Sequence, residues 1–114
     1  RTMKRGEIWV LRDEGYASKP RPVVVIQSDE ITQFQSVILC LLTSFDSTNM
    51  PTRVRIEPSI ENGLLKISWV MTDKITTVPK EMLHKKIGTL RTEELHAINC
   101  QLAIVLGLQS IEFR

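Results

Sequence analysis

The chain has 114 residues, enough for one domain with its own core. Hydrophobic residues make up 42% and charged residues 25%, which excludes a chain that is disordered over most of its length. The net charge is only +2, but bases predominate in residues 1–22 and 53–91 and acids in the segments that follow them, so a basic patch forms if the two basic segments meet in space.

Nothing in the sequence indicates export or insertion into a membrane. No apolar run approaches the ~18–20 residues of a membrane span, and the charged N-terminus lacks the apolar region of a signal peptide. We expect a cytoplasmic protein in which Cys40 and Cys100 are reduced and buried, since no metal-ligand spacing joins them and neither has a nearby histidine. Residues 1–2 are interpreted as a tag remnant, and residues 3–110 as a single domain.

Six segments are rich in β-branched and aromatic residues and predict β-strands. In chain order they are residues 6–11, 23–27, 37–42, 53–57, 64–72 and 75–78. The second and third are too apolar to alternate, so we expect both of their faces to be buried. In the fourth, charged residues alternate with Val54 and Ile56, which is typical of a half-exposed strand.

The C-terminal third predicts one helix. Pro79 is expected in the first position of a single helical turn, and Gly88 is expected to interrupt the chain. Thr92 is expected to cap a helix that ends near Gly107. Its apolar face consists of Leu95, Ile98, Leu102, Val105 and Leu106. The order of elements predicts a mainly β (α+β) fold, a small barrel or strongly twisted sheet covered on one side by the helix.

A stiff cationic segment precedes the second strand. Prolines flank Arg21 and fix the backbone, so the guanidinium is held at a rim where it could grip a phosphate. Thr43 and Ser44 follow the third strand, and they share that rim with Arg21 if the two strands pair. Two plainer interpretations stay open: Arg21 is an ordinary solvated arginine, and the hydroxyls of Thr43 and Ser44 cap a loop. His84 and His96 are interpreted as surface residues.

Three motifs occur in a fixed order: Met3–Trp9 (MKRGEIW), Arg21–Asp29 (RPVVVIQSD) and Leu42–Ser44 (LTS). Together they resemble the MazF/PemK family of toxin endoribonucleases, and weaker similarity continues through Gly63-Leu64 and the terminal helix. The resemblance implies a toxin of a bacterial toxin–antitoxin pair with a small SH3-like β-barrel of the CcdB–MazF type. It also implies a homodimer that cuts single-stranded RNA, usually mRNA, at short sequences without a metal ion or other cofactor, and that is inhibited by a cognate antitoxin.

By the same resemblance, Arg21 matches the catalytic arginine of the family and Thr43 its catalytic threonine. The 2′-OH beside the scissile phosphate would be the nucleophile, giving a 2′,3′-cyclic phosphate and a 5′-OH. Arg21 would stabilise charge on the phosphate, and the Thr43 hydroxyl would donate to it. The general base remains open among Asp13, Glu14, Asp73 and His84.

Further residues are candidates for RNA contacts. Tyr16 could stack on a base or form a lid, whereas Trp9 and Trp69 are expected in the core or at a dimer interface. The candidate polar and cationic contacts are Lys19, Ser44, Arg53, Arg55, Lys66 and Lys74. For the cations among them, a solvated surface is the open alternative.

The loop of residues 12–19 departs from the family pattern. It is shorter than usual and lacks the sequence P-x-x-G-x-E that shapes the RNA groove of relatives. Two other functions therefore stay open. One is a gyrase-inhibiting toxin like CcdB, which shares the fold but for which Arg21 and Thr43 have no evident use. The other is a non-catalytic barrel that binds RNA or protein.

Overall fold

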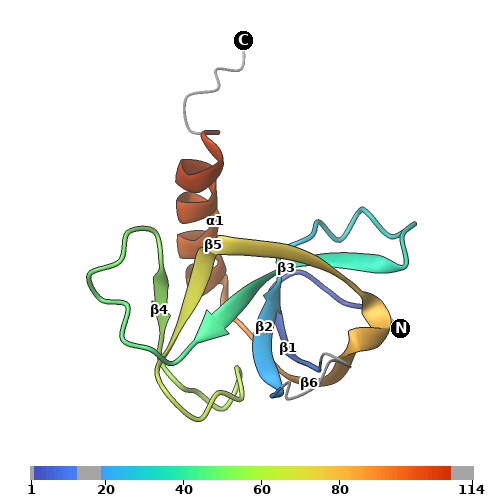
Figure 1. Cartoon of the computed structure of the whole chain (residues 1–114), viewed down its shortest axis with the longest axis horizontal. Coiled ribbons are helices and arrows are strands. Elements are labelled where there is room, and N and C mark those ends of the chain that lie inside the picture. Colours follow the sequence, from blue (N-terminus) through green and yellow to red (C-terminus); the bar gives the residue numbers. More distant parts are fainter. Residues whose placement is uncertain (1, 13–18, 109–114) are drawn as a thin grey trace.

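The computed structural model describes residues 2–12 and 19–108. Figure 1 shows its order of elements: β1 (Glu7–Leu11), β2 (Arg21–Val25), β3 (Ser36–Thr43), β4 (Val54–Ile56), β5 (Ser68–Pro79), the 3₁₀ turn η1 (Lys80–Met82), β6 (Leu83–Thr89) and α1 (Thr92–Leu106). The strands form one antiparallel sheet in the order β4-β5-β3-β2-β1-β6. The predicted class, mainly β with a terminal helix, is confirmed.

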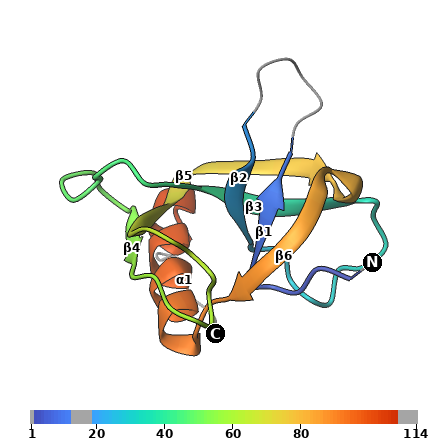
Figure 2. The ribbon, with the colours of Figure 1, turned by 90° about the horizontal axis from the view of Figure 1, so that it is seen from below.

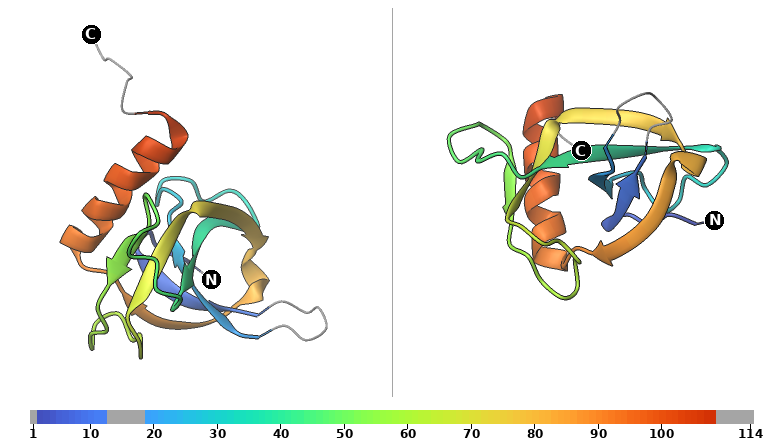
Figure 3. Two further views of the ribbon diagram at one scale, coloured as in Figure 1. Left: turned by 60° about the vertical axis from the view of Figure 1, so that its left-hand side comes forward. Right: turned by 60° about the horizontal axis from the view of Figure 1, so that its bottom comes forward.

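The sheet curls strongly instead of lying flat. β5 is 12 residues long, and η1 turns the chain directly from its end into β6, which pairs with β1 (Figure 2). The curl brings the two ends of the sheet toward each other, as in a small barrel. α1 packs against β5 and β4 on one side of the sheet (Figure 3). No described helix is long and apolar enough to cross a bilayer.

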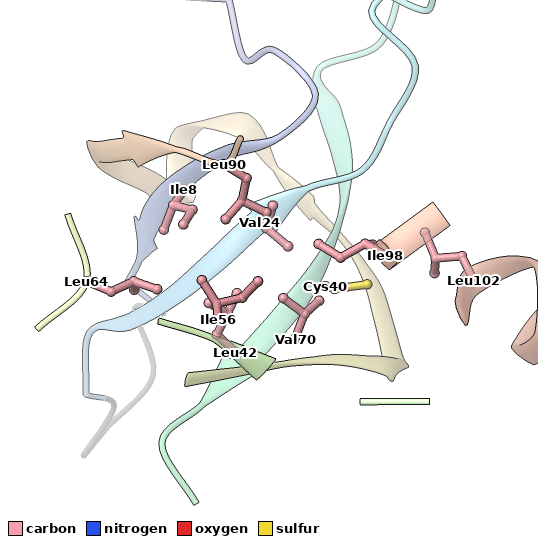
Figure 4. Packing of buried hydrophobic residues seen from close by; sticks show 10 residues of the cluster. All are labelled: Ile8, Val24, Cys40, Leu42, Ile56, Leu64, Val70, Leu90, Ile98 and Leu102. Carbon is pink, nitrogen blue, oxygen red and sulfur yellow. The ribbon is translucent and has the colours of Figure 1, made fainter. Parts of the chain in front are cut away.

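Apolar side chains are buried on both faces of the sheet. The cluster in Figure 4 packs with α1 and comprises Ile8, Val24, Cys40, Leu42, Ile56, Leu64, Val70, Leu90, Ile98 and Leu102. The second cluster comprises Trp9, Val23, Val25, Val37, Leu39, Val78 and Leu83. β2 and β3 contribute to both, which confirms that these two strands bury both faces and explains why their sequences do not alternate.

Three predictions of strand boundaries are wrong. β2 begins at Arg21, two residues before the predicted strand, because Pro22 lies within the ladder opposite Val10. The predicted segments 64–72 and 75–78 belong to one strand, β5, which starts only at Ser68. Gly88 does not interrupt the chain but lies inside β6, where a Cβ atom would be 2.3 Å from the carbonyl carbon of Asn62.

The termini of the helical segments also differ from the prediction. Arg91, not Thr92, is the N-cap residue, and its backbone N–H donates to Oε1 of Glu94 at 2.8 Å. Pro79 ends β5 and precedes η1 instead of occupying its first position. Gly107 ends α1 as predicted, with φ of 73°.

The predicted apolar face of α1 is only partly correct. Ile98 and Leu102 are buried, but Val105 and Leu106 remain 38% and 54% exposed because the helix extends beyond the sheet that it covers.

The two cysteines have different environments. Cys40 is buried as predicted, and burial raises the pKa of its thiol to about 12. Cys100 is exposed, contrary to prediction, and its Sγ lies 3.7 Å from Nε2 of His96 one helical turn earlier. The expectation that Cys100 has no nearby histidine is therefore wrong. His96 is four residues earlier in α1, and residues four apart in a helix share one face.

Candidate functional site

A cleft of about 840 Å³ lies where the first residues of β2, the last residues of β3 and the segment before β5 meet. In Figure 1 the start of β2 and the yellow-green segment before β5 are at the same end of the molecule. The cleft is lined by Val10, Lys19, Pro20, Arg21, Pro22, Leu42, Thr43, Ser44, Gly63, Leu64, Leu65, Lys66, Ser68 and Ile87. Five of the predicted site residues are thus on one surface: Lys19, Arg21, Thr43, Ser44 and Lys66.

Strand register brings Arg21 and Thr43 together. β2 and β3 are antiparallel with Val23 opposite Leu41, so the same register, continued for two residues, puts Arg21 opposite Thr43. Directly opposed residues of an antiparallel pair project from the same face of the sheet. The guanidinium of Arg21 is exposed and makes no hydrogen bond or ion pair with another described residue. It is therefore available to an anion in the cleft.

Thr43 has a partner within its own loop. Its Oγ1 accepts a hydrogen bond from the backbone N–H of Phe45 at 3.1 Å, so the loop-capping interpretation is correct for this residue. A hydroxyl can accept and donate at the same time, and this bond uses only a lone pair of the oxygen. The cap fixes the oxygen and leaves its proton able to point into the cleft.

The cleft combines positive charge with apolar walls. Its cations are Lys19, Arg21 and Lys66, and no Asp, Glu or His is found among its described lining residues. Prolines and aliphatic residues (valine, leucine and isoleucine) form most of the remaining wall. Such a surface suits a ligand that is anionic along one edge and apolar on its faces, as a single-stranded nucleic acid is.

The other predicted RNA contacts do not line this cleft. Arg53 forms a two-point ion pair with Asp73, with Nε and Nη2 each 3.1 Å from a carboxylate oxygen, and hydrogen bonds from Arg53 lower the pKa of Asp73. Arg55 pairs with Glu57, and Lys74 is exposed on β5 away from the cleft. Tyr16 lies outside the described residues.

The two candidate bases among the described residues do not line the cleft. Asp73 is held by Arg53, and His84 is exposed on β6 and does not line the cleft. Asp13 and Glu14 lie outside the described residues. Within residues 2–12 and 19–108, no three His, Cys, Asp or Glu side chains gather as metal ligands would.

The segment 63–68 was missed as a functional element. Only Lys66 was considered as a phosphate contact, and residues 64–72 were interpreted as a strand. Trp9 and Trp69, in contrast, were expected in the core or at a dimer interface, and at 7% exposure each they lie in the core.

Comparison with known proteins gives close relatives over almost the whole chain. Residues 4–106 match the family described as PemK-like, MazF-like toxin of type II toxin–antitoxin system. A "Probable endoribonuclease MazF" of Mycolicibacterium smegmatis is 36% identical over 107 residues, which cover 93% of this chain and 98% of the relative. An "Endoribonuclease MazF" of Staphylococcus saprophyticus is 33% identical over 93 residues, covering 80% of this chain and 77% of the relative.

Solved structures share the fold. An endoribonuclease in complex with its cognate antitoxin from Mycobacterial species superposes with a TM-score of 0.77 at 26% identity, covering 97% of this chain and 99% of the other. The MazE–MazF complex (Form-II) of Deinococcus radiodurans has a TM-score of 0.79 at 16% identity, covering 96% and 99%, and supports the fold alone.

Proposed function

The chain belongs to the family of PemK-like, MazF-like toxins of type II toxin–antitoxin systems, and from this premise we propose that it cuts single-stranded RNA in the cleft between β2, β3 and residues 63–68. The observation that carries the proposal is that Arg21 and Thr43 line one cleft, with the guanidinium unpaired among the described residues. We propose that the cut is sequence-selective, acts on mRNA and needs no metal ion.

The reaction we propose uses the RNA's own nucleophile. The 2′-oxygen attacks the adjacent phosphorus, the bond from phosphorus to the 5′-oxygen breaks, and the products are a 2′,3′-cyclic phosphate and a 5′-OH. The 2′-OH loses its proton to a base and the departing 5′-oxygen gains one. Asp13 and Glu14 stay candidates for the base.

Arg21 and Thr43 have complementary parts in this reaction. Negative charge grows on the non-bridging phosphate oxygens, and a fixed guanidinium stabilises it through two parallel N–H donors. Guanidinium groups hold their protons tightly, so we assign Arg21 to charge stabilisation instead of proton transfer. The oxygen of Thr43 is held by the N–H of Phe45, and its hydroxyl donates a hydrogen bond to the same phosphate.

The same cleft explains how a protein partner would inhibit the toxin. The endoribonuclease from Mycobacterial species was solved in complex with its cognate antitoxin. We propose that this chain acts as a cytoplasmic homodimer and that its own antitoxin lays an acidic segment into the cleft. Opposite charge and competition for one site would then both act against RNA binding.

The test is cleavage of a long single-stranded RNA in EDTA by five proteins: wild type, Arg21→Ala, Thr43→Val, Thr43→Ser and Arg55→Ala. We expect the first and last to cut at the same positions, leaving 5′-OH ends that polynucleotide kinase labels directly. Arg21→Ala should be about 10²–10³-fold slower, the usual loss for one transition-state donor. Thr43→Val should be slowed as well, whereas Thr43→Ser should retain most of the activity.

Other outcomes would identify other functions. Wild-type rates for both Arg21→Ala and Thr43→Val would overturn the site assignment. Uncut RNA together with inhibition of gyrase would support a CcdB-like toxin, and RNA binding without any cleavage would support a non-catalytic barrel.

A further inference from the structure

Two successive leucines in the cleft wall have opposite environments. Leu64 is 7% exposed and belongs to the core cluster drawn in Figure 4. Leu65 is 94% exposed and lines the cleft. Leu65 shares the cleft lining with three cations, so an anionic ligand held there would also bury this exposed side chain.

The backbone that leads into Leu65 is not a loose loop, because Asn62 fixes it. The Asn62 side chain is completely buried, and its Oδ1 accepts from the N–H of Ser59 at 3.0 Å and of Leu64 at 2.9 Å. Its Nδ2 donates to the carbonyl of Glu57 at 2.8 Å. One side chain thus holds three points of the segment 57–64.

Close backbone packing against β6 adds a second restraint. Gly63 has φ of 70°, and a Cβ atom there would lie 2.0 Å from the carbonyl oxygen of Ile87. The N–H of Thr89 donates to the carbonyl of Glu61 at 2.8 Å. Leu65 is therefore presented to the cleft from a rigid base.

Attack of the 2′-oxygen on the adjacent phosphorus requires a particular geometry of the RNA strand. The 2′-oxygen, the phosphorus and the 5′-oxygen must lie nearly in line, and continuous base stacking keeps them out of line. Proteins separate stacked bases by inserting apolar side chains such as leucine between them. Leu65 is an apolar side chain that lines the same cleft as Arg21 and Thr43, and it is available for this task.

Resting on the proposed function, we propose that Leu65 is a wedge that unstacks the bases at the scissile phosphate, while Lys66 binds a neighbouring phosphate. Leu65 is a positioning residue: it takes no part in bond making, and it increases the fraction of bound RNA that is aligned for attack. The occupant is a single strand of RNA, because its unpaired bases suit the apolar walls of the cleft and its phosphates suit the cations of the same cleft.

The chain offers a matched control for the wedge. Ile60 is 99% exposed on the same segment but does not line the cleft. We compare single-turnover cleavage, at saturating concentrations, of a short RNA spanning one mapped cleavage site. Leu65→Ala should be about tenfold slower, the scale of one lost apolar base contact. Ile60→Ala should match wild type, and Leu65→Met should restore most of the rate.

Base separation can be read without cleavage. The same oligonucleotide carries 2-aminopurine next to the scissile phosphate and a 2′-deoxy nucleotide in place of the attacking 2′-OH. Binding of wild type or Ile60→Ala should raise the fluorescence of 2-aminopurine, because the base leaves its stack. Leu65→Ala should bind this RNA yet give a much smaller rise.

The two levels of the proposal fail separately. A wild-type protein that cuts no RNA would overturn the proposed function. A wild type that cuts RNA, beside a Leu65→Ala variant with equal rate and equal fluorescence rise, would overturn the wedge alone. Equal melting temperatures of the variants would exclude misfolding as the cause of any difference.

Discussion

Arg21 and Arg55 are both exposed arginines on β-strands, yet only Arg21 is available to a ligand. Arg55 pairs with Glu57 two residues away on the same face of the strand. Arg21 has prolines on both sides, no described partner, and Thr43 opposite. The difference lies in what surrounds each guanidinium, which local sequence patterns do not disclose. Alternation of charged and apolar residues indicates exposure, but not which rim of the sheet a side chain faces.

Glu7 is a charged residue that serves the fold. Its carboxylate accepts from the backbone N–H of Lys4 at 3.0 Å and from Nε1 of Trp9 at 2.9 Å, and it lies 3.1 Å from Nζ of Lys86. Burial raises the pKa of Glu7, but these hydrogen bonds and the ammonium outweigh it and hold the pKa below the ordinary 4.5. The motif RGEIW thus ties the N-terminal segment to β1 and β6.

This environment predicts a pH-dependent stability. A lowered folded-state pKa means that the unfolded chain binds the proton more tightly, so Glu7 stabilises the fold above pH about 4.5 and loses this effect as the pH falls through its folded pKa. Glu7→Gln should cost about 1–2 kcal/mol of unfolding free energy at pH 7 and much less at pH 3, measured by urea denaturation.

Glu57→Gln is the control for this measurement, because Glu57 is an exposed carboxylate whose ion pair among the described residues is with Arg55, on the surface. It should leave the unfolding free energy nearly unchanged at both pH values. A pH-independent loss in Glu7→Gln would mean that shape, and not charge, matters at position 7.

At the scale of elements, the sequence predicts a strand correctly where the signal lies in the strand itself. It does not predict a strand that depends on a contact with residues far away in the chain. The apolar strands 23–27 and 37–42 predicted their own burial, whereas their pairing, on which the meeting of Arg21 and Thr43 depends, was left open. β6 was missed because Gly88 looks like a chain break, whereas its missing side chain makes room for the backbone of Asn62, 26 residues earlier in the chain. The exposure of Leu65 depends on the same packing and could not be predicted without it.

Gly63 and Gly107 have nearly the same φ, so substitutions at the two positions test this packing separately from the cost of a positive φ. Both have positive φ, 70° and 73°, but a Cβ at Gly63 meets the carbonyl of Ile87, whereas nothing lies within 4 Å of one at Gly107. Gly107→Ala should cost only the left-handed conformation, about 1 kcal/mol. Gly63→Ala adds a backbone clash and should cost about 3 kcal/mol or more in urea denaturation. Equal losses would indicate that the approach to β6 is not tight.

Over the whole molecule, the net charge is small, but the fold gathers positive charge at the cleft. The net charge is +2, and the two basic segments of the sequence, residues 1–22 and 53–91, meet at the cleft. The first supplies Lys19 and Arg21, and the second supplies Lys66. Other cations of the second segment, such as Arg53 and Arg55, are neutralised by carboxylates elsewhere. A polyanion should therefore be attracted to the cleft more than to the remaining described surface.

Salt dependence of RNA binding measures how many of these charges a bound strand neutralises. Each phosphate contact on a single strand contributes a slope of about −0.7 to log K against log salt, so three cations predict about −2. We would measure binding of the non-cleavable oligonucleotide by fluorescence anisotropy between 50 and 200 mM salt. Lys66→Ala should make the slope shallower by about 0.7. Arg55→Ala should leave the slope unchanged, because Glu57 already neutralises that charge. If Arg55→Ala made the slope shallower and Lys66→Ala did not change it, the RNA would lie on the outer face of β4 instead of in the cleft.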